Sequence, residues 1–143
     1  MLRCETAGPE DISVIYDLSK ALIHEYEDIA SIDYDKVLAW VYRKIENNIG
    51  QYSCVYENGQ KVGYYRTADE DGRTELDDLY VLPTFRNRGI GTRILGKITA
   101  EAKLPVFLYV FKGNTGAIRL YERSGFSIER EVGTTRLIMV RNG

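Results

Sequence analysis

A strand, a loop, a helix and a second strand follow one another between Thr74 and Phe111, and this succession constrains the fold more than any other feature. Thr74 to Leu82 have the pattern of a strand, which Pro83 ends because proline cannot donate to a strand ladder. The helix that follows carries apolar residues on one side: Ile90, Ile94, Leu95, Ile98 and Ala102. Val106 to Phe111 are so uniformly apolar that both faces of this strand should be buried. The order predicts a β-loop-α-β unit in an α/β fold.

Two helices are expected before this unit. Pro9, Glu10 and Asp11 provide a helix start, and apolar residues at helical spacing continue to about Tyr26. A second helix follows Asp33 and closes near Gly50. The other expected elements are strands Leu2 to Thr6, Tyr52 to Tyr56, Lys61 to Thr67, Phe126 to Glu131 and Thr135 to Val140, and a short helix at Thr115 to Ser124 that Gly125 ends.

The size and charge of the chain exclude several classes of protein. Its 143 residues, 44% of them hydrophobic, predict a single domain over residues 1–143. A formal net charge of −2 argues against a nucleic-acid binder. Without an apolar run of about 18 residues or a signal peptide, we expect a cytoplasmic protein with no membrane segment. Cys4 and Cys54 have no disulfide-framework spacing, which suits a reducing compartment and small core residues.

The segment from Val81 to Thr92 is the most informative for function, because it lies where a strand hands over to a helix. Free backbone N–H groups at a helix N-terminus attract anions, and glycines let a phosphate approach the backbone closely. Here Gly89 and Gly91 stand at the expected helix entrance, and three arginines add positive charge: Arg86, Arg88 and Arg93. We therefore expect a pyrophosphate site, unless the two glycines only shape the helix entrance.

Other phosphate-binding loops do not fit this segment. A P-loop requires a lysine directly after its second glycine, and Thr92 follows Gly91. A dinucleotide fingerprint requires a third glycine, and Ile94 occupies that position. The remaining pattern is Arg86-x-x-Gly89-x-Gly91.

A second pattern lies downstream, with Asn114, Ala117, Tyr121 and Gly125-Phe126 in order. Together the two patterns resemble the GNAT superfamily of N-acetyltransferases, whose acyl-CoA signature is Gln/Arg-x-x-Gly-x-Gly/Ala, and the resemblance covers roughly residues 74 to 130. It implies a mixed, mostly antiparallel, twisted sheet of about seven strands flanked by four helices. It also implies that the fourth and fifth strands are parallel and splayed.

The resemblance implies acetyl-CoA as co-substrate, no metal, and direct attack by a primary amine in a ternary complex. Tyr121 matches the tyrosine that protonates the leaving thiolate, since a phenol stays protonated at neutral pH; the alternative is a core tyrosine. A main-chain N–H near Leu79 would serve the oxyanion. Asn114 would bind the pantetheine arm, cap a helix, or do both. The implied acyl-CoA-binding residues are Leu79, Tyr80, Val81, Arg86, Asn87, Arg88, Gly89, Ile90, Gly91, Thr92, Asn114, Ala117 and Tyr121.

The general base is expected on the strand that begins at Thr74. Regular alternation would place Glu75, Asp77, Leu79 and Val81 on one face and Leu76, Asp78 and Tyr80 on the other. Glu75 is the first candidate, because it stands eleven residues before Arg86, and Asp77 is the second. Both carboxylates could instead be solvated, and His24, the one histidine, is a further candidate base.

The acceptor is less defined than the donor. Eight acidic residues stand in segments that frame the acceptor mouth in the resembled family, and they favour a cationic small molecule or a protein amino group: Glu25, Glu27, Asp28, Asp33, Asp35, Asp69, Glu70 and Asp71. Solvated loops would explain them equally well. The competing functions are a non-catalytic acyl-CoA-binding module and a nucleotide-binding protein. We expect a monomer or homodimer.

Overall fold

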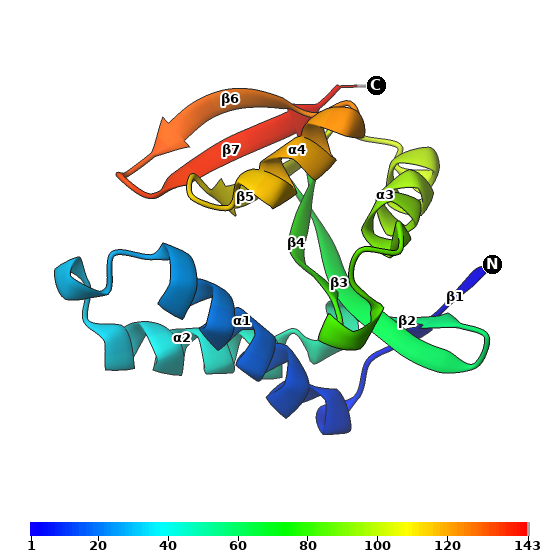
Figure 1. The fold of residues 1–143 in the computed structure, drawn as a ribbon, viewed down its shortest axis with the longest axis horizontal. Helices are drawn as coiled ribbons and strands as arrows, with labels where there is room; N and C mark the ends of the chain where they lie inside the picture. Colours follow the sequence, from blue (N-terminus) through cyan, green and yellow to red (C-terminus); the bar gives the residue numbers. More distant parts are fainter. Residues whose placement is uncertain (143) are drawn as a thin grey trace.

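The computed structural model describes residues 1–142 and contains a seven-stranded sheet with helices on both faces (Figure 1). The strands are β1 (Leu2–Thr6), β2 (Tyr52–Glu57), β3 (Gln60–Glu70), β4 (Arg73–Val81), β5 (Val106–Phe111), β6 (Ser127–Val132) and β7 (Arg136–Arg141). The α-helices are α1 (Ile12–Tyr26), α2 (Tyr34–Asn47), α3 (Ile90–Glu101) and α4 (Thr115–Arg123). The strand order is β1-β2-β3-β4-β5-β7-β6, and among these described strands only β4 and β5 pair in parallel. The predicted fold class is confirmed.

The two larger hydrophobic cores lie on opposite faces of the sheet. On one face α1 and α2 bury Ile15 and Ile45 against Tyr52 and Tyr64 of the central strands. On the other face α3 buries Ile94 against Val55 and other strand residues, and α4 packs at the edge of the same core. In Figure 1, α1 and α2 lie together on one side of the molecule, and α4 lies with β5, β6 and β7 on the other. The two cores therefore hold β4 between two different sets of helices.

The helix ends differ slightly from the predicted ones. Pro9–Asp11 form a 3-10 turn, so that α1 starts at Ile12, and α2 ends at Asn47 before a second 3-10 turn over Ile49–Gln51. Helix ends commonly tighten in this way, because 3-10 bonds satisfy terminal backbone groups. Within residues 1–142, no helix combines the length and the hydropathy that crossing a bilayer requires.

A buried carboxylate joins the start of α1 to the sheet. One oxygen of Asp11 accepts hydrogen bonds from Lys61 Nζ at 2.7 Å and Tyr64 Oη at 2.9 Å, and the other accepts from Gly8 N at 3.0 Å and Cys54 Sγ at 3.4 Å. Burial opposes ionisation of Asp11, but these donors outweigh it and lower its pKa to about 2. Burial and the hydrogen bond to Asp11 raise the pKa of the Cys54 thiol to about 12. Cys54 is therefore an unreactive core residue, as the sequence indicated.

A β-bulge in β4 overturns the predicted division of its residues between the two faces. The pairing with β3 passes from Tyr64↔Tyr80 to Arg66↔Asp77, so that β4 contains one extra residue. Asp78 has φ of 52°, in the left-handed region. A bulge interrupts alternation, because two residues then oppose one on the partner strand.

As a result, Asp77 and Asp78 both face α2, where Lys44 binds both carboxylates. Leu79 and Val81 pack instead in the core under α3, on the face that also buries Leu76. The prediction that Glu75 and Asp77 share a face with Leu79 and Val81 is therefore wrong, and so is the grouping of Leu76 with Asp78 and Tyr80.

Candidate active site

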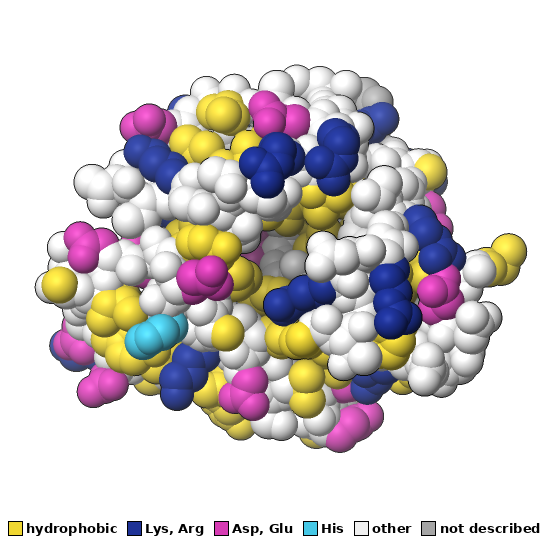
Figure 2. Space-filling model, in the orientation of Figure 1, with side chains coloured by type: hydrophobic (Ala, Val, Ile, Leu, Met, Phe, Trp, Pro, Cys, Tyr) yellow, Lys and Arg dark blue, Asp and Glu magenta, His cyan; other side chains and the backbone are white. Residues whose placement is uncertain are grey.

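A cavity of 490 Å³ lies where β4 and β5 separate. The two strands pair only at Thr74↔Val106 and Glu75↔Phe107, and then diverge toward their C-terminal ends. The cavity is lined by α1 and α2 on one side of the sheet, by the last six residues of β4, by the end of β5, and by α4. Figure 2 shows a hollow near the centre of this face, with basic and acidic side chains near its rim. The splay places backbone from β4 and residues from five other elements (α1, α2, β5, α4 and β7) around one space.

Eight of the predicted site residues line this cavity: Asp77, Leu79, Tyr80, Val81, Arg86, Asn114, Ala117 and Tyr121. They come from β4, the following loop and α4, so the fold brings the two sequence patterns together. Glu75 and the predicted loop residues Asn87 to Thr92 are not among the described residues that line it. His24, the third candidate base, is exposed beside the ring of Tyr34, with the ring centroids 6.3 Å apart.

Asn114 and Tyr121 are positioned by the two ends of α4. Asn114 is the N-cap, and its side-chain oxygen accepts from Ala117 N at 3.2 Å. Tyr121 packs edge-on against Phe126, with ring centroids 5.8 Å apart. Burial, together with the negative charges of Asp77 and Asp78, raises the pKa of Tyr121 to about 12. Its phenol therefore carries a proton at neutral pH.

The predicted acids Glu75 and Asp77 belong to a group of charges that reaches the cavity through Lys44, Asp77 and Asp78, and the sequence did not predict this grouping. Lys44 of α2 donates to Asp77 at 2.9 Å and to Asp78 at 3.1 Å, and all three side chains are less than a quarter exposed. Arg66 of β3 donates to Asp77 at 3.2 Å and lies 4.0 Å from Glu75. This group, the β4 acid cluster, consists of three carboxylates and two cations, which leaves one negative charge when all are ionised.

The protonation of the β4 acid cluster responds to burial and to the mutual repulsion of its acids. Burial and then the charge of Asp78 raise the pKa of Asp77, although Lys44 and Arg66 oppose this. Burial and then the charge of Asp77 raise the pKa of Glu75. A carboxylate with a raised pKa accepts a proton more readily at neutral pH, as a general base must.

Hydrogen bonds connect the β4 acid cluster to hydroxyl groups around it. Asp78 accepts from Tyr52 Oη at 2.5 Å and from Tyr80 Oη at 2.9 Å. The Tyr80 hydroxyl also lies 2.7 Å from Ser19 Oγ of α1. Ser19, Tyr80, Asp78 and Lys44 all line the cavity, so polar groups of three elements converge on its deep end.

The loop before α3 has the form of an anion site. Gly89 caps α3 with φ of 75°, and Asn87 also has a positive φ of 64°. The first N–H groups of α3 lack intrahelical partners, as in every helix. All three arginines have protein partners: Arg86 Nε donates to Val81 O at 3.0 Å, the Arg88 guanidinium lies 5.6 Å from the ring centroid of Phe85, and Arg93 forms an ion pair with Glu57. Because Glu57 compensates the charge of Arg93, the positive charge available for a ligand is smaller than the count of arginines indicated.

Gly91 has a packing role as well. A Cβ at this position would stand 3.2 Å from Cδ2 of Leu120, so the small residue allows α3 to approach α4 closely. A bulky substitution would therefore disturb helix packing as well as any bound phosphate. Gly89, where nothing lies within 4 Å of an added Cβ, is required for its backbone conformation instead.

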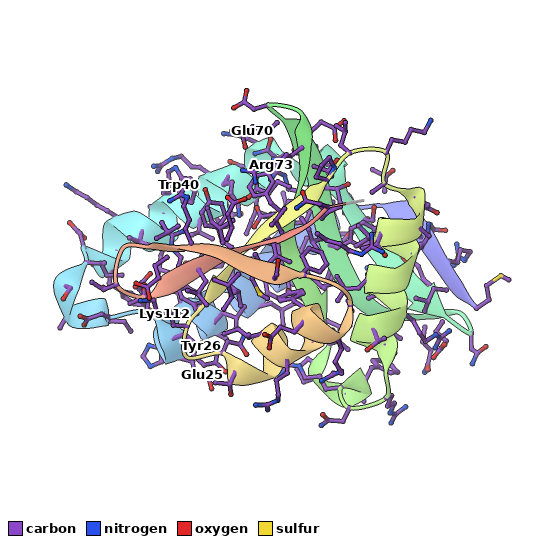
Figure 3. All side chains as sticks on the ribbon, turned by 90° about the horizontal axis from the view of Figure 1, so that it is seen from above. Glu25, Tyr26, Trp40, Glu70, Arg73 and Lys112 are labelled. Atoms are coloured by element: carbon purple, nitrogen blue, oxygen red, sulfur yellow. The ribbon has the colours of Figure 1, made fainter. Side chains whose placement is uncertain are left out.

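The outer part of the cavity contains residues that no sequence pattern indicated. These residues are Tyr26 at the end of α1, Tyr109 of β5 and Arg136 of β7. Tyr26 stacks on Phe111 with ring centroids 6.1 Å apart, and Figure 3 labels Glu25 and Tyr26 near Lys112, which follows β5. Of the eight acidic residues expected to frame an acceptor, only Glu25 lines the cavity.

Comparisons with known proteins agree with this architecture. The family model described as the acetyltransferase (GNAT) family matches residues 15–126. An uncharacterized N-acetyltransferase of Methanocaldococcus jannaschii is 34% identical over 113 residues, which are 71% of this chain and 48% of that protein. A spermine/spermidine N(1)-acetyltransferase of Bacillus subtilis is 29% identical over 91 residues, 54% of this chain and 60% of that protein. The chain thus spans about half of these relatives.

Solved structures give the same fold. The PaiA N-acetyltransferase of Thermoplasma acidophilum in complex with coenzyme A superposes with a TM-score of 0.73 at 18% identity, over 100% of this chain and 99% of that one. No group of three or more His, Cys, Asp or Glu side chains arranged to hold a metal ion occurs in the part of the chain that the structure describes.

Proposed function

The chain belongs to the acetyltransferase (GNAT) family, and from this membership we propose that it transfers an acetyl group from acetyl-CoA to a primary amine. The observation that carries the proposal is the cavity between β4 and β5. There, Tyr121 and the backbone of β4 meet the β4 acid cluster around a single space. Thioester aminolysis needs a donor for sulfur, a donor for the carbonyl oxygen and an acceptor for the amine proton, and the lining offers all three.

Acetyl-CoA binds along β4 and the N-terminus of α3 in this proposal. The backbone N–H groups of Arg88 to Thr92 hold the pyrophosphate, which the left-handed Gly89 and the helix dipole support. Leu79 and Val81 offer backbone groups to the pantetheine amides, and Asn114 adds its side-chain amide. The related fold crystallised with coenzyme A is consistent with this assignment.

The chemical step is direct attack. The neutral amine nitrogen forms a bond to the thioester carbonyl carbon, and the carbon–sulfur bond breaks. The negative charge on the carbonyl oxygen is stabilised by the N–H of Leu79, which follows the bulge in β4. Tyr121 gives its proton to the departing thiolate and can regain one from solvent, since its pKa of about 12 exceeds that of a thiol.

Asp77 is the better placed of the two predicted bases. Asp77 lines the cavity, whereas Glu75 lies in the part of β4 that is still paired with β5 and is not among the lining residues. We assign Asp77 the acceptance of the amine proton, directly or through a water molecule, because burial and the charge of Asp78 raise the pKa of Asp77. Both acids predicted from the sequence thus remain in the proposed site, but Asp77 replaces Glu75 as the first candidate base.

The acceptor presents an ammonium group to the β4 acid cluster before it loses a proton. The single uncompensated negative charge of this cluster favours a cation. The B. subtilis relative named for spermine and spermidine acts on such amines. Leu18, Leu22 and Phe111 in the cavity lining would pack against the hydrocarbon part of the acceptor.

The deciding experiment is release of free thiol from acetyl-CoA in the presence of alkylamines, polyamines, amino acids and peptides. Turnover with at least one amine, and an acetylated product by mass spectrometry, is expected. Binding of acetyl-CoA without turnover on any amine would favour the alternative, a non-catalytic acyl-CoA-binding module. A thermal-shift comparison of acetyl-CoA with ATP and NAD tests the nucleotide-binding alternative, because a ligand stabilises the protein that binds it.

A further inference from the structure

Asp78 has a backbone conformation that is unusual for its place in the fold. Four non-glycine residues among residues 1–142 have positive φ: Asn58, Asp71, Asp78 and Asn87. Three of them lie in turns or loops, and Asp78 alone lies inside a strand. Positive φ is uncommon for any residue with a side chain, although aspartate tolerates it better than most, so contacts that hold Asp78 in this conformation are expected.

The side chain of Asp78 supplies that restraint. Its carboxylate accepts from Tyr52 of β2 at 2.5 Å, from Lys44 of α2 at 3.1 Å and from Tyr80 at 2.9 Å, and Tyr80 is in turn bonded to Ser19 of α1. The carboxylate is only 10% exposed. Three elements thus fix one side chain whose backbone has the left-handed conformation.

Leu79 directly follows Asp78, and its backbone N–H is the group to which we assigned the role of oxyanion donor. The β3–β4 pairing gives no partner to Asp78 or Leu79, since it steps from Tyr80 directly to Asp77. A left-handed residue at a bulge redirects the following peptide group. On the basis of the proposed acetyl transfer, we propose that Asp78 is a positioning residue: its carboxylate holds the left-handed turn of β4 that aims the Leu79 N–H at the acetyl carbonyl oxygen.

A competing role for Asp78 is direct action through its charge, as an ammonium ligand or proton acceptor. Three donors already occupy most of the roughly four acceptor positions of this carboxylate, which makes it a poor base. Asp77, which lines the same cavity and accepts from Lys44 and Arg66, is the freer group. The structure therefore favours an action of Asp78 through the backbone.

Three substitutions separate the two roles. Asp78→Asn keeps an acceptor oxygen and tolerates the left-handed region, so kcat at saturating amine should stay within about threefold of wild type, whereas the loss of one negative charge from the β4 acid cluster should raise the KM for a cationic amine. Asp78→Gly loses the restraint but allows the conformation without strain. Asp78→Ala loses the carboxylate restraint and also tolerates the left-handed conformation poorly. Its kcat should fall by roughly 100-fold, which is the effect of misplacing a catalytic group by about 1 Å. The expected order of kcat is Asn, Gly, Ala, with the KM for acetyl-CoA changing much less.

Asp71 offers a matched control. It has φ of 51° in the β3–β4 turn, is exposed, and does not line the cavity. Asp71→Gly and Asp71→Ala measure how these substitutions act at an aspartate with positive φ that lies away from the cavity. The kcat of both variants should remain at the wild-type value. If all three Asp78 variants lose activity equally, the charge is what matters and the proposal is overturned. Wild-type kcat in Asp78→Ala overturns it as well.

A second measurement does not depend on turnover, so it separates this proposal from the proposed function. The amide ¹H chemical shift of Leu79 should differ between the acetyl-CoA and coenzyme A complexes in wild type and Asp78→Asn, because only acetyl-CoA brings the carbonyl oxygen. The difference should disappear in Asp78→Ala. If no amine is a substrate, the proposed enzymatic function fails while this measurement still decides the role of Asp78; an unchanged difference in Asp78→Ala overturns that role.

Discussion

Removing the charge of Lys44 should destabilise the protein strongly, because Lys44 is the cation that bridges two carboxylates. Its ammonium lies 2.9 Å from Asp77 and 3.1 Å from Asp78. In Lys44→Met a side chain of similar length remains, but the two acids then face each other with only Arg66 beside Asp77 as compensation.

The size of the effect follows from burial. Exposure of the three side chains is 19%, 23% and 10% for Lys44, Asp77 and Asp78, so solvent screens them only partly. Breaking a buried ion pair by removing one partner costs about 3–5 kcal/mol. Partial exposure and the remaining Arg66 favour the lower end, about 3 kcal/mol, which corresponds to a fall in Tm of roughly 6–12 °C for a domain of this size.

The loss of folding stability in Lys44→Met should depend on pH in a defined direction. Burial alone would lower the pKa of Lys44, but the charges of Asp78 and Asp77 raise it above its ordinary value. The stability that Lys44 contributes is therefore present at neutral pH and disappears only at strongly alkaline pH. In the variant, Asp77 loses this cation, so the pKa of its carboxyl group, already raised by burial, rises further. A folded state with raised carboxyl pKa values binds protons more readily than the unfolded state, so the deficit should shrink as the pH falls.

Urea denaturation of wild type and Lys44→Met at about pH 7.5 and about pH 5 measures both effects. Lys36→Met is the matched control on the same helix, because Lys36 is 87% exposed and its single ion pair, with Asp33, is long at 3.9 Å. This substitution should change the free energy of unfolding by no more than about 0.5 kcal/mol. A Lys44→Met deficit no larger than that of the control, or one that is equal at the two pH values, would refute the reasoning.

Three further predictions concern chemistry and stability. Tyr121→Phe should lower kcat by about 100-fold with little change in the calorimetric Kd for acetyl-CoA, since it removes only the proton donor; wild-type turnover would reduce Tyr121 to packing. In pH profiles of kcat/KM, Asp77→Asn should lose more than Glu75→Gln and recover partly at high pH, where more amine arrives neutral; the opposite ranking would return the role of base to Glu75. The pKa of Asp11 is lowered to about 2, so its ionised form should add about 2 kcal/mol to the free energy of unfolding above pH ~4, and this contribution should be lost between pH ~4 and ~2. Urea denaturation should therefore show that Asp11→Asn is destabilised at neutral pH only.

The order of the elements could be predicted because each one has a local periodic signal. The apolar stripe of α3 and the uniformly apolar β5 identified the β-loop-α-β unit; β5 is buried on both faces over Val106, Phe107 and Leu108, but Tyr109 is 43% exposed, so the predicted burial holds only for the first half of the strand. Asn114 and Tyr121 were named from the resemblance of their segment to the GNAT pattern, and they lie at the cap and near the end of α4. These features depend on residues a few positions apart, which a sequence displays directly.

The β4 acid cluster could not be predicted in the same way. Lys44 and Asp77 are 33 positions apart, and their contact depends on how α2 packs across the sheet. Alternation also failed at Asp78, because a bulge adds one residue and moves every later side chain to the other face. No residue type in β4 marks the bulge except an aspartate, which tolerates positive φ but is common in many other settings.

The two halves of the site therefore differ in what determines them. In the proposed site, the acetyl-CoA half uses backbone groups of β4 and the entrance of α3, where a glycine pattern is enough to indicate an anion site. The proposed acceptor half uses side chains that α1, α2 and β7 bring to the cavity, among them Ser19, Glu25 and Arg136. These contacts span distant parts of the chain, and substitutions there can alter the acceptor without disturbing the donor site. Differences in substrate among proteins with this fold should accordingly lie in the helices before β2, whereas the loop before α3 should serve the same donor in each of them.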